Sequence, residues 1–147
     1  MLGRFATGVT VLTLRDETDQ PAGMTASSLA SVSLEPPLVS VCISHTAELH
    51  DLILATPEFV VNILASEQEE LSRRFADPHE DRFAGVGYHQ GPEGQIRLDG
   101  ALAHIECTRF ATYPGGDHTI VIGRVIGGEA HDGHPLLYYR GGYATLG

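Results

Sequence analysis

Residues 9–28 read Val9-Thr-Val-Leu-Thr-Leu-Arg-Asp-Glu-Thr-Asp-Gln-Pro-Ala-Gly-Met-Thr-Ala-Ser-Ser28, and this stretch predicts a β-hairpin. Its first five residues are rich in β-branched side chains, which favour strands. The polar run from Asp16 to Gly23 supplies turn-forming residues, and a second strand is expected over residues 23–28. The chain therefore starts as antiparallel β structure.

The rest of the chain continues this pattern of short apolar runs between turns. The 17 glycines and 8 prolines punctuate the runs at intervals typical of all-β domains. Ser66 followed by Glu69 has the spacing of a capping box, which marks a helix start. Residues 77–94 are predicted to form a long irregular surface loop. Helices are predicted over 49–54 and 66–75, and further strands over 38–44, 59–64, 101–112, 119–128 and 136–139.

Length, charge and hydropathy restrict the kind of protein. A chain of 147 residues predicts a single domain over residues 1–147. Its formal charge of −10 argues against partners such as nucleic acid or an anionic membrane surface. No apolar run approaches the ~20 residues that a bilayer-spanning helix needs, so no membrane span is expected. The composition indicates a globular barrel or sandwich, mainly β, with two short helices.

The N-terminus and the cysteines indicate a reducing compartment. Residues 1–7 lack the basic and apolar regions of an export signal. Cys42 and Cys107 each lie in an apolar, strand-like run, so both are expected to be buried free thiols. These features predict a cytoplasmic protein without a disulfide framework.

Eight histidines raise the question of a metal site, but their spacing in the sequence does not support one. The only close pairs are His45 with His50 and His131 with His134, and neither lies beside a cysteine. Structural or surface roles are expected for them, and no metal is predicted. His118 is the exception, because it follows Gly115-Gly-Asp in a tight turn, where it is either a turn residue or a ligand contact.

Two groups of hydrogen-bond donors are candidates for binding an anion. Thr25-Ala-Ser-Ser28 places small hydroxyl groups at a strand end, and Ser72-Arg-Arg74 adds a hydroxyl and two guanidinium groups. Both groups also fit plainer roles, the first as solvated turn residues and the second as charges complementing a helix C-terminus. Composition and spacing leave both alternatives open.

Seven segments in a fixed order resemble the flavin reductase-like family of FMN-binding split barrels. The resemblance is strongest to the short reductase components of two-component flavin monooxygenases, such as 4-hydroxyphenylacetate 3-monooxygenase, and covers nearly the whole chain. The segments are Arg4-Phe-Ala-Thr-Gly-Val-Thr-Val-Leu-Thr13, Gly23-Met-Thr-Ala-Ser-Ser-Leu-Ala-Ser-Val-Ser-Leu-Glu-Pro-Pro-Leu38, Phe59-Val-Val-Asn-Ile-Leu64, Leu71-Ser-Arg-Arg-Phe-Ala76, Gly100-Ala-Leu-Ala103, Gly116-Asp-His118 and Leu137-Tyr-Tyr-Arg-Gly-Gly-Tyr143.

The resemblance implies a fold and an activity. The fold is a six-stranded antiparallel Greek-key split β-barrel with two or three short helices, which pairs into a homodimer. The activity is reduction of FMN or FAD by NADH or NADPH, with hydride transfer to flavin N5 and delivery of reduced flavin to a separate monooxygenase. Members of the family usually carry a further helix before the Arg-Phe-Ala-Thr-Gly stretch, which this sequence lacks.

The resemblance also implies site residues. His118 would orient the nicotinamide without acting as a base, because hydride transfer to a flavin requires no proton-abstracting side chain. The nicotinamide contacts implied are His118, Tyr139, Arg140 and Tyr143. The flavin contacts implied are Thr25, Ala26, Ser27, Ser28, Ser33, Leu34, Pro37, Ser44, Asn62, Ser72, Arg73 and Phe75.

Two alternatives stay open at this point. One is a flavin-binding oxidoreductase with another acceptor, such as a ferric or cobalt chelate, or with a tightly held flavin and its own substrate. The other is a non-catalytic module that binds or stores flavin. Such a module would keep the hydroxyl cluster at residues 25–28 but would need neither His118 nor Tyr143.

Overall fold

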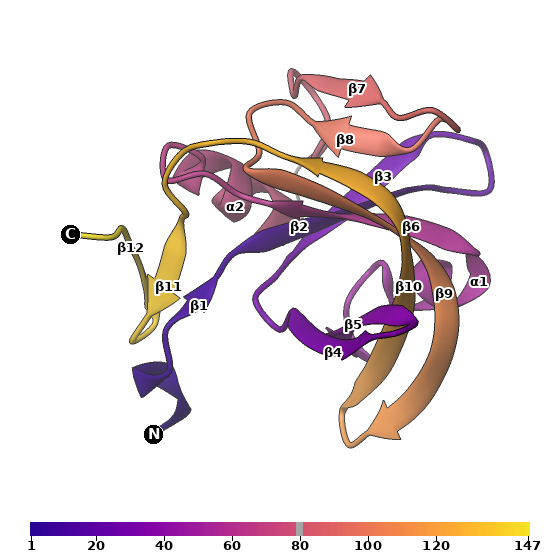
Figure 1. Ribbon diagram of the computed structural model, residues 1–147, viewed down its shortest axis with the longest axis horizontal. Helices are drawn as coiled ribbons and strands as arrows, with labels where there is room; N and C mark the ends of the chain where they lie inside the picture. The colour runs from indigo at the N-terminus through magenta and orange to yellow at the C-terminus, as the bar shows by residue number, and fades with distance from the viewer. Residues whose placement is uncertain (79–80) are drawn as a thin grey trace.

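The computed structural model describes residues 1–78 and 81–147, and its centre is one antiparallel sheet of seven strands (Figure 1). The strand order across the sheet is β3-β2-β6-β9-β10-β5-β4. In chain order these strands are β2 (Thr10–Arg15), β3 (Pro21–Ala26), β4 (Ala30–Leu34), β5 (Pro37–Ser44), β6 (Glu58–Ile63), β9 (Ala103–Gly115) and β10 (His118–Ala130).

The sheet rolls up because its two longest strands are bent. β9 and β10 each run for 13 residues, and their pairing shifts register between Ile122 and Gly123 and between Val125 and Gly127. Such bulges increase local twist and bend a strand. The end of β3 thereby approaches β5, where the Ser28 hydroxyl accepts a hydrogen bond from the Cys42 N–H at 2.9 Å. The mainly β split barrel expected from the sequence is confirmed.

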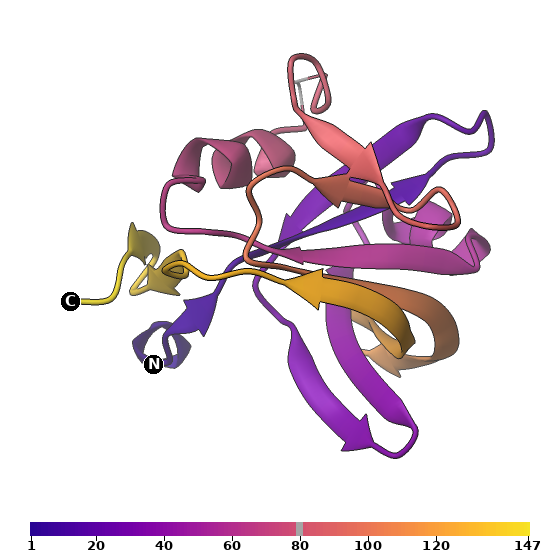
Figure 2. The same ribbon diagram turned by 45° about the horizontal axis from the view of Figure 1, so that its top comes forward.

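Within residues 1–78 and 81–147, two small sheets and three short helices complete the fold. β1 (Thr7–Gly8), β11 (Leu137–Tyr139) and β12 (Gly142–Ala144) form a sheet near both chain ends, and β7 (Tyr88–Gln90) pairs with β8 (Ile96–Leu98). The helices are η1 (Leu2–Arg4), α1 (His50–Ala55) and α2 (Glu69–Ala76). In Figures 1 and 2, α2 and the β7–β8 hairpin lie on the same side of the main sheet. Within the described residues no helix is long and apolar enough to span a bilayer.

Strand β2 is buried on both of its faces. Leu12 and Leu14 point into the barrel, where they join a cluster that includes Val61 and Val121. Val11, on the opposite face, packs in a second cluster with Phe75 of α2 and other residues. Five consecutive residues of the strand are therefore buried, because α2 and the β7–β8 hairpin cover the face that the barrel does not.

The contact between α2 and β3 depends on a glycine. A Cβ atom at Gly23 would lie 2.9 Å from the Leu12 carbonyl oxygen and 2.9 Å from a ring carbon of Phe75. Both contacts are closer than van der Waals packing allows, so Phe75 can pack against the strand only when residue 23 is glycine. This packing contact holds α2 beside β3.

Three expectations from the sequence need correction. Residues 30–34, which the sequence did not predict as a strand, form β4 and add an edge strand beside β5. The capping box at Ser66 is wrong: its hydroxyl bonds Glu67, and α2 begins three residues later, at Glu69. The loop predicted over residues 77–94 contains β7, which pairs with β8. The helix at 49–54 and the remaining strands are confirmed within a few residues.

Both cysteines are free, as expected. Cys107 is buried, and that burial raises the pKa of its thiol to about 12. Cys42 is only half-buried, because it lies on the opposite face of its strand from the barrel interior. Neither forms a disulfide in this structure.

Asn62 of β6 is a buried polar hub between three strands. Its amide nitrogen donates to the Val11 carbonyl and to the Thr13 hydroxyl, both at 2.9 Å, and its amide oxygen accepts from the Leu98 N–H at 2.9 Å. The side chain has no exposed surface. These hydrogen bonds tie β2 and β6 to the β7–β8 hairpin.

Replacing Asn62 by alanine should therefore destabilise the fold. We expect Asn62→Ala to lower the free energy of unfolding by about 2–4 kcal/mol, because it leaves a buried N–H and a carbonyl without partners. Equilibrium urea unfolding measures this loss. The matched control is Gln90→Ala, which removes an exposed amide and should change stability by less than about 0.5 kcal/mol. A loss below about 1 kcal/mol for Asn62→Ala would contradict a structural role for this side chain.

Candidate functional site

A groove lies where the end of β3, helix α2 and the β11–β12 hairpin meet. Its volume is about 230 Å³, and its walls combine hydroxyl groups with two tyrosine rings. It is lined by Val9, Thr25, Ala26, Ser27, Ser72, Ala76, Tyr138 and Tyr143. Three segments that are far apart in the sequence therefore share one surface.

Hydrogen bonds between hydroxyl groups and backbone hold these three segments together. The Thr25 hydroxyl donates to the Ser72 carbonyl oxygen at 2.6 Å, which joins β3 to α2. The Ser72 hydroxyl and the Tyr143 hydroxyl lie 2.7 Å apart, which joins α2 to β12. Ser72 is completely buried, so it acts as the fixed centre of the groove wall.

Arg73 brings a positive charge to the aromatic wall. Its guanidinium carbon lies 4.8 Å from the centre of the Tyr143 ring, a cation–π distance. Its Nε also donates to Glu69 at 3.1 Å, but 64% of the side chain stays exposed. Tyr138 meets Tyr143 edge to face with ring centres 5.5 Å apart. Past Arg73 the hollow continues along Gly141 and Gly142.

The groove also extends in the other direction, past Thr25. There Thr25 and Ala76 are joined by Thr46, Glu48 and Arg82 as lining residues. The Arg82 guanidinium donates to the Gly23 carbonyl at 2.7 Å, which anchors the residues after α2 to β3. A second guanidinium group therefore stands near this part of the groove.

His118 and Ser44 lie together at the end of β10 and β5. They are cross-strand partners, and the His118 ring contacts the Asp117 carboxylate at 2.7 Å. That hydrogen bond and the nearby imidazole charge hold the pKa of Asp117 below its usual value. The Ser44 hydroxyl lies 3.0 Å from the hydroxyl of Thr46, which lines the extended groove. This short connection links the strand end of His118 to the groove.

The donor set fits a ligand that combines an aromatic ring system, a polyol chain and a phosphate. Tyrosine faces stack on planar rings, hydroxyl groups bond a polyol, and an accessible guanidinium group matches phosphate. These local donors matter because the chain as a whole carries a charge of −10. An anionic ligand would be repelled wherever such donors were not gathered.

The structure brings together five of the twelve flavin contacts expected from the sequence and separates the rest. Thr25, Ala26, Ser27, Ser72 and Arg73 meet at the groove or its extension, and Tyr143 of the nicotinamide set lies with them. Ser44 lies instead with His118, as described above.

Four of the expected flavin contacts lie away from the groove on or beside β4 and β5. Ser28 is occupied by hydrogen bonds to the Cys42 backbone. Ser33 and Leu34 belong to β4, and Pro37 opens β5; Leu34 is 90% exposed. None of these four side chains lines the groove described here.

Asn62 and Phe75 are placed in the core and not at the groove surface. The Asn62 amide is hydrogen-bonded to the neighbouring strands. Phe75 has no exposed surface and packs against Gly23, although its ring borders the extended groove. Tyr139 and Arg140 stand exposed at the β11–β12 turn, where Arg140 adopts a positive φ of 53°. Their roles remain predictions.

Three lining residues were not predicted: Val9, Ala76 and Tyr138. Ala76 is four residues after Ser72, so it lies on the same face of α2. Tyr138 is the cross-strand partner of Tyr143. Helical spacing and hairpin register would have identified both, once Ser72 and Tyr143 were assigned.

Comparisons with known proteins agree with this architecture. The family model described as "Flavin reductase like domain" matches residues 2–147. The chain is 42% identical over 147 residues to the reductase subunit HsaB of a flavin-dependent monooxygenase from Rhodococcus jostii, covering 99% of this chain and 75% of that protein. It is 42% identical over 151 residues to an NADH-dependent flavin reductase from a Rhodococcus species, covering 99% of this chain and 82% of that protein.

A solved structure shows the same fold. The NADH:FAD oxidoreductase SgcE6 from Streptomyces globisporus, in complex with NAD and FAD fragments, superposes with a TM-score of 0.94 at 40% identity. The match covers 99% of this chain and 88% of that one. With a family match over almost its entire length and relatives of this identity, the chain belongs to the flavin reductase-like domain family.

Proposed function

We propose that this chain is an NADH-dependent flavin reductase that reduces FMN or FAD and passes the reduced flavin to a separate monooxygenase component. The observation that carries the proposal is the convergence of Thr25, Ser72, Arg73 and Tyr143 on one groove, joined by the Ser72–Tyr143 hydrogen bond. The choice of NADH is supported by relatives and a solved structure whose names include NADH.

The groove residues would bind and orient the flavin and would not react with it. Thr25 and Ser27 offer hydroxyl groups to the ribityl chain, and Arg73 offers charge-assisted hydrogen bonds to the phosphate. The buried Ser72 hydroxyl holds Tyr143 in place beside them. Tyr138 and Tyr143 exclude water from one side of the site. A bound flavin supplies the hydride-accepting N5 atom, so the protein's task is to hold two rings in contact.

The His118 end of the site would receive the nicotinamide. The imidazole is fixed by Asp117 at 2.7 Å, so one ring nitrogen is engaged and the other is free to bond a carboxamide. This is an orienting role that needs no change of protonation. Ser44 is its cross-strand neighbour and is linked through Thr46 to the groove.

Three further properties belong to the proposal. Residues 1–147 act as one domain, supported by the family match. Exposed apolar side chains on β4, β9 and β10, among them Val32, Phe110 and Ile126, support a homodimer, which sedimentation equilibrium would report as twice the chain mass. The free cysteines support a cytoplasmic location.

The first test is a steady-state assay of NADH oxidation by the purified protein. We expect oxidation to depend on added FMN or FAD and to saturate with it, because the flavin is taken up from solution. Absorbance of NADH follows the reaction, and a spectrum of the protein before addition measures flavin already bound. Flavin binding without NADH oxidation would refute the reductase and favour a binding or storage module.

Arg73 should discriminate between flavins with and without phosphate. We expect Arg73→Ala to raise the KM for FMN about tenfold, which corresponds to the loss of one charge-assisted contact of about 1.4 kcal/mol. The KM for riboflavin, which has no phosphate, should change less than about twofold. Arg124→Ala, at an exposed arginine of β10, is the control. Equal weakening of both flavins would contradict a phosphate contact.

His118 should affect the nicotinamide and not the flavin. We expect His118→Ala to lower kcat/KM for NADH at least tenfold while leaving the KM for FMN unchanged, because the imidazole orients only the dinucleotide. His118→Gln should restore part of the rate, since the amide still donates a hydrogen bond. His134→Ala removes another exposed histidine as a control. Unchanged NADH kinetics in His118→Ala would remove this residue from the site.

A further inference from the structure

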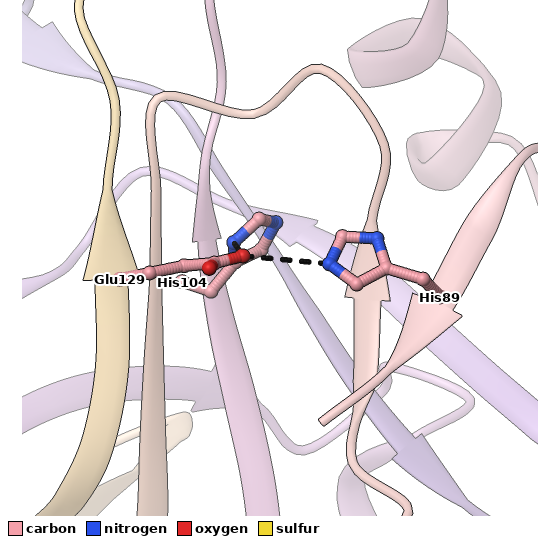
Figure 3. Close-up of side chains that lie close together, drawn as sticks. All are labelled: His89, His104 and Glu129. Atoms are coloured by element: carbon pink, nitrogen blue, oxygen red, sulfur yellow. Dashed lines mark hydrogen bonds and ion pairs between the residues drawn. The ribbon is translucent and has the colours of Figure 1, made fainter. Parts of the chain in front are cut away.

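His89, His104 and Glu129 form a cluster that the proposed reaction does not use. His89 comes from β7, His104 from β9 and Glu129 from β10, and Figure 3 shows both imidazoles directed at the Glu129 carboxylate. One ligand atom from each residue can be chosen so that all lie within 4.8 Å of one another. The Glu129 Oε1 atom lies 3.3 Å from His104 Nδ1 and 3.4 Å from His89 Nε2.

Hydrogen bonds on the far side of each ring fix how the rings face this oxygen. His104 Nε2 lies 2.8 Å from the Leu98 carbonyl oxygen, an acceptor only, so this nitrogen carries a proton and donates. His89 Nδ1 lies 2.8 Å from the Asp99 carboxylate and donates in the same way. When each ring is neutral, the nitrogens that face Glu129 are therefore lone pairs.

When both rings are neutral, these two nitrogens and the Glu129 Oε1 atom are all hydrogen-bond acceptors that face one another. His104 is 2% exposed, and its Nδ1 has no hydrogen-bond partner among the described residues. Two nitrogen lone pairs and a carboxylate oxygen directed at one point are a set of ligands that can coordinate a metal cation.

The backbone holds this arrangement in place. Glu129 and His104 are cross-strand partners after the register shift in β9 and β10. Gly128 precedes Glu129 with a φ of 148°, and a Cβ there would lie 2.0 Å from the His104 carbonyl oxygen. Only glycine permits this close approach, which presents Glu129 beside the His104 ring.

The charges around the cluster favour a divalent cation. Arg97 lies 3.4 Å from Glu129 Oε1, but its guanidinium already donates to both oxygens of Glu106. Three carboxylates, Asp99, Glu106 and Glu129, against this one guanidinium leave a formal charge of −2 with neutral imidazoles. In metal sites of proteins, a histidine ligand usually donates its other ring N–H to a carboxylate or a backbone carbonyl. Asp99 and the Leu98 carbonyl are such acceptors for His89 and His104.

We propose that His89, His104 and Glu129 form a binding site for a divalent transition-metal ion of the zinc type. Ligand atoms on tetrahedral Zn²⁺ lie about 3.3–3.4 Å apart when the bonds are about 2.0–2.1 Å long. The two distances from Glu129 match this value, and the two imidazole nitrogens lie within 4.8 Å of each other. His131 Nε2, 3.5 Å from Glu129 Oε1, is the nearest group for the fourth position.

The ion would fasten the β7–β8 hairpin to the main sheet. His89 belongs to that hairpin, whereas the other two ligands belong to β9 and β10. The site would therefore act on stability and not on hydride transfer, and it stands independently of the proposed reductase activity.

The test is metal uptake by the full chain after treatment with EDTA. Equilibrium dialysis against Zn²⁺, followed by elemental analysis, should give one ion per chain, and Co²⁺ should give the visible absorption of a tetrahedral site. Zn²⁺ should raise the Tm by about 5 °C or more at saturation, whereas Mg²⁺, which prefers oxygen ligands, should not. Absence of stoichiometric Zn²⁺ uptake would overturn the proposal and leave a proton-linked ion network.

Variants separate this site from adventitious binding to other histidines. His89→Ala and Glu129→Gln should each weaken Zn²⁺ binding at least tenfold and abolish the Tm shift. His134→Ala removes an exposed histidine outside the cluster and should leave both unchanged. Because His89 and Glu129 are partly exposed, both variants are expected to fold, which circular dichroism checks. Zn²⁺ affinity equal to that of the unsubstituted protein in both variants would also overturn the proposal.

Discussion

The two-sided burial of β2 and β6 is the constraint on which the rest of this structure depends. One face of these strands fills the barrel with residues such as Leu12 and Val61, and the other face requires a second layer. Helix α2 and the β7–β8 hairpin supply that layer (Figure 2). The second layer also has to satisfy buried polar groups, since Asn62 bonds the Leu98 backbone and the Thr13 hydroxyl bonds the Ile96 carbonyl.

The position of the groove follows from this layering. Phe75 can lie against β3 only because residue 23 is glycine, and this contact sets the distance between α2 and the strand. Ser72 and Arg73 precede Phe75 on the same short helix, so they are carried to the end of β3 with it. The Thr25 and Tyr143 hydrogen bonds to Ser72 then close the site. The position of the groove thus follows from the contacts that attach the outer layer to the main sheet.

Local sequence signals predicted those elements whose own residues determine them. The first hairpin, β5 and α1 have strong β-branched or helical patterns and clear proline or turn boundaries, and they are found where expected. β4 and β7 were missed because most of their residues are exposed or polar, and β8 was missed because only two apolar residues, Ile96 and Leu98, mark it in the sequence. Their strand form is seen only in their pairing. The capping spacing at Ser66 failed because a neighbouring glutamate takes the hydroxyl.

The site was predictable to the extent that it rests on family motifs. Thr25, Ser72 and Arg73, all expected as flavin contacts, lie at one groove, and Tyr143, expected as a nicotinamide contact, lies there too. A motif does not tell which of its residues point to a ligand and which to the core. Asn62 and Phe75 are a polar and an aromatic residue in such motifs, and both are buried. Whether a side chain points to the core or to a ligand depends on strand register and on its position around a helix, and both are determined only in the assembled fold.

The long β9–β10 ribbon carries the two proposed sites at different ends. His118 opens β10 at one end of the ribbon, and Glu129 lies opposite His104 near the other. Eleven residues of strand at about 3.3 Å each place roughly 35 Å of chain between them. In the two proposals, the histidines of this chain therefore act at different ends of one ribbon. His118 would orient the nicotinamide at the turn, and His104 would help to attach the β7–β8 hairpin to the main sheet near the other end.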